Sequence, residues 1–310
     1  MAKKIIFMGT PLFAVPILKS LYQNGFPICT VYTQPPHKSH RGQKINKSPI
    51  QGISETLNID FRSPQSLKNN KEEYEFLKNL DADLAIVVAF GQIIPKEFLS
   101  LTKKGFINIH ASILPRWRGA APIQRSIMNL DPETGISIMK INEELDSGPV
   151  SNIYKIKLDQ NLNAKEVSEK LSLLAADKIL DNVDDILEGN LNFLDQDHSK
   201  ATYAKKISKN EGQISWNDDV SKIIGKINGL YPSPGAFFSF SGERYKILKA
   251  EIGDGLGKSG EVITNNLEIA CNNNKSIKIL EIQREGKKAQ KIGEFMLGSR
   301  IRKGSEISNV

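Results

Sequence analysis

Short apolar runs alternate with helix-like patterns through roughly the first two hundred residues of the chain. Runs typical of buried strands occupy residues 5–8, 28–32, 84–89, 106–109 and 136–141. Helix-like segments occupy residues 11–23, 71–79, 120–128 and 164–187. Strands separated by helices form βαβ units, so the pattern predicts a Rossmann-like α/β fold, in which a mostly parallel sheet carries helices on both faces.

The pattern changes near residue 190. Glu188-Gly189-Asn190 is a helix-stop signal, and the polar stretch 205–210 is typical of an exposed linker. The β-type runs that follow are separated by Gly, Asn and Ser turns, and they occupy residues 236–240, 244–248, 261–263, 267–270 and 276–280. This spacing predicts a small C-terminal β-barrel of the oligonucleotide-binding type. We therefore expect a catalytic domain over residues 1–189, a linker over 190–209 and a barrel domain over 210–310.

Length and composition agree with two ordinary domains. The chain has 310 residues, of which 39% are hydrophobic and 25% charged. It contains no run of about 18 apolar residues, so we expect no membrane-spanning helix and no membrane partner. Cys29 and Cys271 are far apart and the four histidines are scattered, which predicts no metal site. Unpaired cysteines are typical of a reducing compartment, and we expect a cytoplasmic monomer.

The positive charge is concentrated in two places. Residues 206–310 carry 17 Lys and Arg against 12 Asp and Glu, a net charge of +5, while residues 1–205 carry 25 against 23, a net charge of +2. The polar stretch 34–50 reads as a long loop with no acid between residues 37 and 47, and its cations are Lys38, Arg41, Lys44 and Lys47. Both features fit a polyanionic partner that offers phosphates, and both fit a solvated surface equally well.

The most informative polar residues are Asn108 and His110, at the end of an apolar run. Side chains two residues apart in a strand share a face, and ligands bind outside the carboxyl ends of strands in open α/β sheets. Asp146 lies in the acidic turn 142–149, after the next run, and we expect this turn to reach the same crevice. Glu143 and Glu144 share the turn, but Ser147-Gly148 makes a tight turn that favours Asp146.

These three groups suit the transfer of a small acyl group to an amine. A carboxylate beside an imidazole can remove the amine proton, and an amide with a protonated imidazole can stabilise a tetrahedral oxyanion. No nucleophilic Ser or Cys is apparent, which favours direct transfer. Gly9-Thr10-Pro11 is neither a dinucleotide fingerprint nor a P-loop; it can bind an anion at a helix start or form a plain turn.

The residues around His110 resemble those of the folate-dependent formyltransferases. The resemblance rests on Asn108-x-His110, Ser112-x-Leu114-Pro115 and the downstream Asp146. The run Leu114-Pro115-Arg116-Trp117-Arg118-Gly119-Ala120-Ala121-Pro122-Ile123-Gln124 is similar to the branch that acts on an aminoacylated tRNA. Further similar segments are Ile6-Phe7-Met8-Gly9-Thr10-Pro11, Thr33-Gln34-Pro35, Val87-Val88-Ala89-Phe90-Gly91 and Thr202-Tyr203-Ala204.

The resemblance implies 10-formyltetrahydrofolate as the formyl donor and the amino group of methionyl initiator tRNA as the acceptor. It implies Asn108, His110 and Asp146 as the catalytic residues. The implied folate site comprises Val88, Phe90, Gly91, Ser112, Ile113, Leu114 and Pro115. The tRNA contacts comprise Lys38, Arg41, Lys44, Lys47, Lys206 and Lys209. Gln43 and Ser233 depart from the family pattern, which usually has a basic residue and Trp at these positions.

Three alternatives share parts of this pattern. A formyltransferase for a small amine, such as a sugar nucleotide or glycinamide ribonucleotide, would keep the three catalytic residues but would not need the basic regions. A folate hydrolase would release formate with no amine present. An RNA-binding protein with this fold would show no folate turnover.

Overall fold

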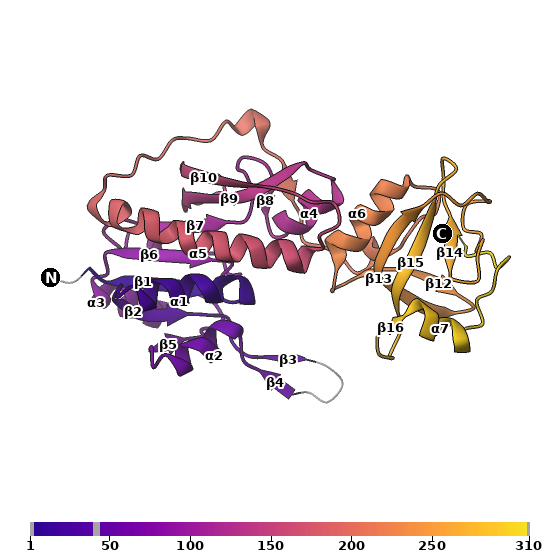
Figure 1. Ribbon diagram of the computed structural model, residues 1–310. Helices are drawn as coiled ribbons and strands as arrows, with labels where there is room; N and C mark the ends of the chain where they lie inside the picture. Colours follow the sequence, from indigo (N-terminus) through magenta and orange to yellow (C-terminus); the bar gives the residue numbers. More distant parts are fainter. Residues whose placement is uncertain (1–2, 40–43, 309–310) are drawn as a thin grey trace. The chain divides into compact units, whose positions relative to one another are not determined.

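The computed structural model describes residues 3–39 and 44–308, and its backbone divides into two compact units. The first unit comprises residues 1–119, 135–156 and 168–203, and the second comprises residues 120–134, 157–167 and 204–310, the undescribed residues aside. The chain thus passes between the units several times, so each unit is built from segments that are distant in sequence (Figure 1).

The first unit is built on a seven-stranded sheet with the strand order β10-β9-β7-β6-β1-β2-β5. Its strands are β1 (Ile5–Gly9), β2 (Ile28–Tyr32), β5 (Phe61–Arg62), β6 (Leu84–Val88), β7 (Phe106–His110), β9 (Glu133–Lys140) and β10 (Val150–Lys157). The pairs β1·β2, β1·β6, β6·β7 and β2·β5 are parallel, whereas β9 runs antiparallel to β7. The predicted mostly parallel α/β sheet is confirmed.

Helices bury the sheet on both faces. All five residues of β1 and of β6 are buried, as continuous apolar strands are when both faces are covered. The helices of this region are α1 (Val15–Gln23), α2 (Pro49–Thr56), α3 (Lys71–Leu80) and α5 (Ala164–Glu188). Helices α1 and α5 lie together over one face, where the Ser20 hydroxyl donates to the Ala176 carbonyl (Figure 1). On the other face of the sheet, Leu77 of α3 belongs to the same hydrophobic core as Ile6 and Met8 of β1.

The second unit contains an antiparallel half-barrel, which confirms the predicted C-terminal β domain. Its strands follow the order β12-β13-β15-β14, with β16 paired to β15. They are β12 (Ala236–Phe240), β13 (Glu243–Gly253), β14 (Glu268–Ala270), β15 (Ser276–Arg284) and β16 (Gln290–Lys291). Phe238 stacks on Tyr245 at 5.4 Å in its core, beside the fully buried Trp216. This unit also contains α4 (Pro122–Met128), α6 (Val220–Leu230) and α7 (Ile292–Gly298).

The polar stretch 34–50 is not the long loop that we expected. Residues His37–Ser39 (β3) and Lys44–Asn46 (β4) form an antiparallel pair, and α2 begins at Pro49. The Ser48 hydroxyl accepts the Gln51 N–H, so Ser48-Pro49 is a helix N-cap followed by proline at the first helical position. This local signal was present in the sequence and was missed.

The β-type runs after residue 210 did not predict the helices of this region. Helix α6 precedes the sheet, with its N-terminus capped by Asp219, and Val220, Ile223 and Ile227 occupy one helical face. Glu261 and Val262 form isolated bridges where a strand was expected over residues 261–263. Within the described ranges, no helix is both long and apolar enough to cross a membrane.

Candidate active site

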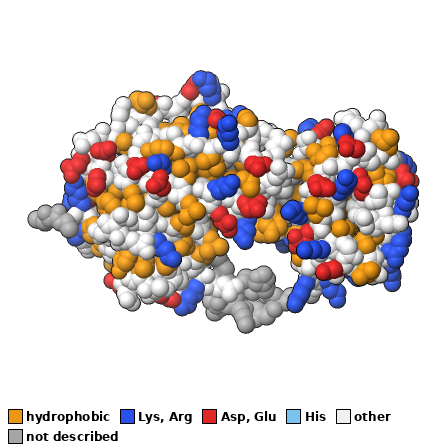
Figure 2. Space-filling view, in the orientation of Figure 1, with side chains coloured by type: hydrophobic (Ala, Val, Ile, Leu, Met, Phe, Trp, Pro, Cys, Tyr) orange, Lys and Arg blue, Asp and Glu red, His pale blue; other side chains and the backbone are white. Residues whose placement is uncertain are grey.

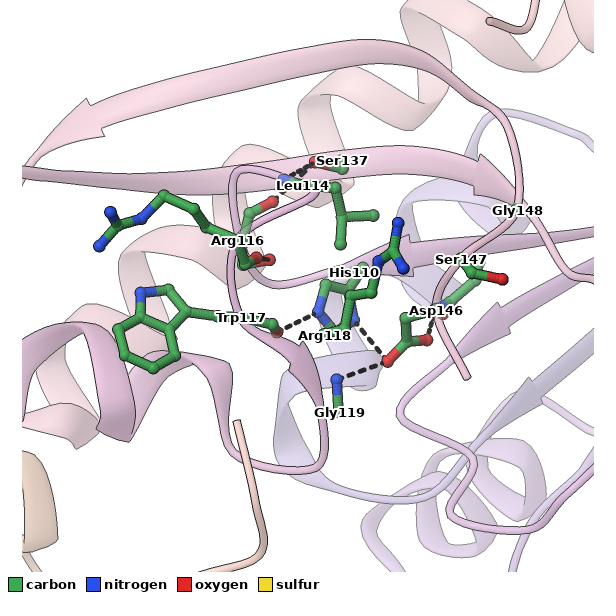
Figure 3. A network of polar contacts seen from close by, with 12 residues as sticks. His110, Leu114, Arg116, Trp117, Arg118, Gly119, Ser137, Asp146, Ser147 and Gly148 are labelled. Carbon is green, nitrogen blue, oxygen red and sulfur yellow. Dashed lines mark hydrogen bonds and ion pairs between the residues drawn. The ribbon is translucent and has the colours of Figure 1, made fainter. Parts of the chain in front are cut away.

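The structure brings Asn108, His110 and Asp146 together. The Asn108 amide donates to Asp146 Oδ1 at 3.4 Å, and His110 Nδ1 lies 3.6 Å from Asp146 Oδ2. The imidazole is 7% exposed and the carboxylate 15%, so both are largely shielded from solvent. Figure 3 shows the His110 ring between the Trp117 carbonyl and Asp146.

The hydrogen-bond partner of His110 Nε2 determines which ring nitrogen carries the proton. Nε2 lies 2.9 Å from the Trp117 carbonyl oxygen. A carbonyl oxygen can only accept, so this contact assigns a proton to Nε2. Nδ1 is then the nitrogen that gains or loses a proton, and it is the one that faces Asp146. The pair can therefore take up a proton from a neighbouring group and hold the resulting imidazolium against a carboxylate.

The path of the chain from β9 to Asp146 differs from the one that the order of strands along the sequence suggested. Because β9 runs antiparallel to β7, its last residue, Lys140, pairs with Ile107 and not with the end of β7 at His110. The 142–149 turn therefore starts near the beginning of β7, yet it reaches Asn108 and His110 as we expected. The turn instead doubles back, and Asp146 takes the left-handed conformation with φ of 48°, which Asp tolerates better than most residues.

The structure also distinguishes Asp146 from the other acids of its turn. Asp146 Oδ2 accepts the Gly119 N–H at 2.8 Å, a charge-assisted bond to the strand β8 (Arg118–Gly119). Glu143 is exposed and pairs with Lys96, while Glu144 is exposed. Asp146 is thus the acid of this turn that meets Asn108 and His110.

The Ser112–Pro115 segment is held rigid by buried hydroxyls. The Ser112 hydroxyl donates to the Arg116 carbonyl at 2.6 Å. Ser137 Oγ, on β9, accepts the Leu114 N–H at 3.1 Å and donates to the Ser112 carbonyl at 2.7 Å (Figure 3). Both serines are buried. Each hydroxyl proton is thereby committed to a backbone carbonyl, so neither serine is arranged as a nucleophile.

The predicted folate residues differ in what they can offer a ligand. Val88, Phe90, Ser112 and Leu114 are buried, whereas Ile113 and Pro115 are half-buried and Gly91 is exposed. The buried members can support a ligand site from behind, and the others can contact it directly.

Sequence reasoning missed three exposed apolar residues in the first unit. Leu12 and Ile93 follow the parallel neighbours β1 and β6, and Leu145 adjoins Asp146; their exposed fractions are 74%, 88% and 65%. Isolated apolar residues just after strand ends were the available signal. In the part of the chain that the structure describes, no group of three His, Cys, Asp or Glu side chains is placed to hold a metal ion.

The predicted tRNA-binding residues belong to both units. Lys38 lies on β3 and Lys44 on β4, while Arg41 lies outside the described residues. Lys47 pairs with Glu55 of α2 at 2.9 Å, and hydrogen bonding to Lys47 lowers the pKa of Glu55. Lys206 and Lys209 are exposed. Figure 2 shows further Lys and Arg side chains on the surface of the C-terminal unit, interspersed with acids.

Comparison with known proteins places this chain in a family. Two family models match: "Formyl transferase" over residues 3–183, and "Formyl transferase, C-terminal domain" over residues 206–300. The methionyl-tRNA formyltransferase of Pelagibacter ubique (strain HTCC1062) is 68% identical over 310 residues, which is 100% of each chain. The chain belongs to the methionyl-tRNA formyltransferase family. The methionyl-tRNA formyltransferase of Chelativorans sp. (strain BNC1) is 39% identical over 313 residues, with 99% of this chain and 100% of that protein covered.

Membership of the methionyl-tRNA formyltransferase family makes the chain an enzyme of the folate-dependent formyltransferase class, as its His110 motif predicted. Solved structures share its fold. An N-formyltransferase from Helicobacter canadensis, in complex with folinic acid and dTDP-3-aminofucose, superposes with a TM-score of 0.68 at 18% identity over 92% of this chain and 100% of that one. HypX from Aquifex aeolicus with tetrahydrofolic acid gives 0.64 at 16% identity, over 96% of this chain and 47% of that one.

Proposed function

We propose that this chain transfers the formyl group of 10-formyltetrahydrofolate directly to the amino group of methionyl initiator tRNA, giving N-formylmethionyl-tRNA. The observation that carries the proposal is the cluster of Asn108, His110 and Asp146, in which an amide donor, an imidazole and a carboxylate converge. The name of the relatives that match over the full length of the chain supports the acceptor.

In this proposal the three side chains act on a tetrahedral intermediate. The attacking amine loses a proton, which His110 Nδ1 receives while Asp146 stabilises the imidazolium. Asn108 has two amide hydrogens, of which Asp146 accepts one, so the second can donate to the developing oxyanion. The proton held at Nδ1 is then available to the leaving folate nitrogen. Because Ser112 and Ser137 are both committed to carbonyls, direct transfer is favoured over an acyl-enzyme.

The folate is proposed to bind beside Ile113, Pro115 and the backbone at Gly91. Flat heteroaromatic rings bind among apolar side chains with a few placed polar groups, and Leu12 and Ile93 supply exposed apolar surface after β1 and β6. The positive φ angles of Ala89 and Gly91 turn the chain sharply as it leaves β6, which presents backbone groups at the same edge.

The tRNA is proposed to contact the β3·β4 region, including Arg41, together with Lys206 and Lys209 in the second unit. Phosphate contacts release counterions, so we expect tRNA affinity to fall steeply as salt rises. Arg41→Ala should weaken tRNA engagement more than folate binding, because phosphate contacts position the nucleic acid. Equal effects on both substrates would contradict this assignment.

The decisive experiment measures formyl transfer from 10-formyltetrahydrofolate to methionyl initiator and methionyl elongator tRNA in parallel. Strong preference for the initiator supports the proposal. Formylation of a small amine such as a dTDP-amino sugar, with neither tRNA formylated, would keep the chemistry and overturn the acceptor. Formate release with no amine present would indicate a hydrolase.

A further inference from the structure

The side chain of Gln196 joins the catalytic turn to a buried arginine. Its Nε2 atom donates to the Asp146 carbonyl at 3.0 Å and to the Gly148 carbonyl at 2.7 Å. Its Oε1 atom accepts two bonds from Arg118, from Nε at 3.0 Å and from Nη2 at 2.8 Å. Carbonyls only accept and guanidinium groups only donate, so these four contacts fix which end of the amide is which. Gln196 is 8% exposed, and each of its polar atoms is satisfied.

A carboxylate would stabilise the buried guanidinium of Arg118 more strongly than the amide of Gln196 does. Arg118 is 3% exposed, and in the described part of the chain its guanidinium bonds otherwise only to His198 Nδ1, at 3.3 Å. A carboxylate would stabilise a buried cation better than a neutral amide oxygen. Glutamate at position 196 could supply that carboxylate, but it could not donate to the carbonyls of Asp146 and Gly148. The two N–H groups are therefore what distinguishes the amide from an acid at this position.

The carbonyls of Asp146 and Gly148 lie within the turn that presents the catalytic carboxylate. Asp146 has a left-handed backbone, and Gly148 packs so closely that a β-carbon would lie 2.0 Å from the Lys140 carbonyl oxygen. A left-handed non-glycine residue persists only where its surroundings hold it. The Gln196 amide holds the peptide of Asp146 itself, and Gly119 holds the carboxylate of the same residue.

We propose that Gln196 is a positioning residue for catalysis, which fixes the backbone at Asp146 and so keeps its carboxylate against His110. This inference rests on the catalytic role of Asp146 in the proposed function. Gln196 itself contacts neither Asn108 nor His110, so its effect is expected on turnover and not on substrate binding.

The test is Gln196→Glu, which retains the shape of the side chain and the acceptor for Arg118 but replaces both donors. We expect kcat to fall about tenfold to a hundredfold, since small displacements of a reacting group cost this much. The KM for tRNA and for 10-formyltetrahydrofolate should change by less than about threefold. The substitution leaves unchanged the contacts that the protein makes equally with the bound substrate and with the transition state. The melting temperature should fall, because the second carboxylate oxygen faces the carbonyls of Asp146 and Gly148, and the ion pair gained by Arg118 offsets only part of that loss. Wild-type kcat in this variant would overturn the proposal, and so would a fall in kcat matched by an equal rise in KM.

Two further variants keep the test decisive. If Gln196→Glu does not fold, Gln196→Met introduces no charge and should give the same loss of kcat with unchanged KM, although it should also melt lower because Arg118 loses its acceptor. A wild-type kcat for Gln196→Met would overturn the proposal. Asn24→Asp is the matched control: it makes the same chemical change in an exposed amide that donates to the Ser20 carbonyl, and it should leave kcat unchanged.

Asp146→Asn separates this inference from the proposed function. If Asp146→Asn is nearly inactive while Gln196→Glu turns over normally, the positioning role fails and the catalytic assignment stands. If Asp146→Asn retains activity within about tenfold of wild type, the catalytic assignment itself fails.

Discussion

Replacing Asp146 by asparagine tests the centre of the proposed site with the smallest change in shape. The Gly119 N–H, the Asn108 amide and His110 Nδ1 all converge on its carboxylate. An asparagine there has one oxygen and one NH₂ group. In either orientation of its amide, the NH₂ group faces a donor, Gly119 or Asn108, so one contact becomes repulsive. The substitution also removes the charge that stabilises an imidazolium at His110.

The distance between the two groups gives the expected magnitude. Unit charges 3.6 Å apart attract by about 4–5 kcal/mol at an effective dielectric of about 20, and this is a ceiling because Asp146 is partly exposed. Each 1.4 kcal/mol or so changes a rate tenfold, so the ceiling corresponds to about three orders of magnitude. We expect the single-turnover rate of Asp146→Asn to fall by about two to three orders of magnitude, and the melting temperature to fall because one contact of the new side chain is repulsive.

The assay is rapid-quench formylation of methionyl initiator tRNA at saturating 10-formyltetrahydrofolate, which removes substrate binding and product release from the measured rate. Glu144→Gln is the control, because it makes the same change two residues away on an exposed side chain. A rate for Asp146→Asn within about tenfold of wild type, in a folded protein, would refute the reasoning from the carboxylate.

Three further predictions concern other parts of the chain. Ser137→Ala leaves the Leu114 N–H without its acceptor, so the melting temperature should fall and the KM for 10-formyltetrahydrofolate should rise by about three- to tenfold. An unchanged KM in steady-state assays would mean that the hydroxyl does not shape the folate site. The hydrogen bond from Arg125 lowers the pKa of Glu211 below its ordinary value, so the ion pair stabilises the fold above that ordinary value and this stabilisation is lost as the pH falls through the lowered pKa. Thermal melts should show a higher melting temperature for wild type than for Glu211→Gln at pH 7 and a difference that closes in acid. A difference in melting temperature that does not depend on pH would contradict this. Burial raises the pKa of Cys271 to about 12, so its thiol should resist alkylation at pH 8 until denaturant is added, as mapped by mass spectrometry; rapid labelling of the native protein would show that the thiol is accessible.

Local patterns in the sequence predicted the elements whose signals are contained within a few neighbouring residues. The 25-residue helix α5 was expected over residues 164–187 and extends over Ala164–Glu188. Asn108 and His110 were expected on one strand face, because alternation is a property of the strand itself. The Ser48-Pro49 start of α2 was equally local, and there the information was present and overlooked.

Tertiary structure decided what depends on the path of the chain between distant segments. The antiparallel direction of β9 cannot be derived from a strand pattern, because it is set by the strand that β9 meets. The Ser147-Gly148 turn favoured Asp146 over Glu143 and Glu144, but only the fold brings its carboxylate to Asn108 and His110. The same holds for Gln196, which is separated by 50 residues from Asp146 and by 78 from Arg118.

The sequence by itself therefore determined which residue types were available for formyl transfer, since a strand-end Asn-x-His motif and an acidic turn are local features. Only the tertiary structure decided how they are oriented. The carbonyl of Trp117 assigns the protonated nitrogen of His110, and the Gly119 amide aims the Asp146 carboxylate. Those contacts depend on backbone groups, which every residue carries alike, so their positions are fixed by the fold and leave no mark in the sequence.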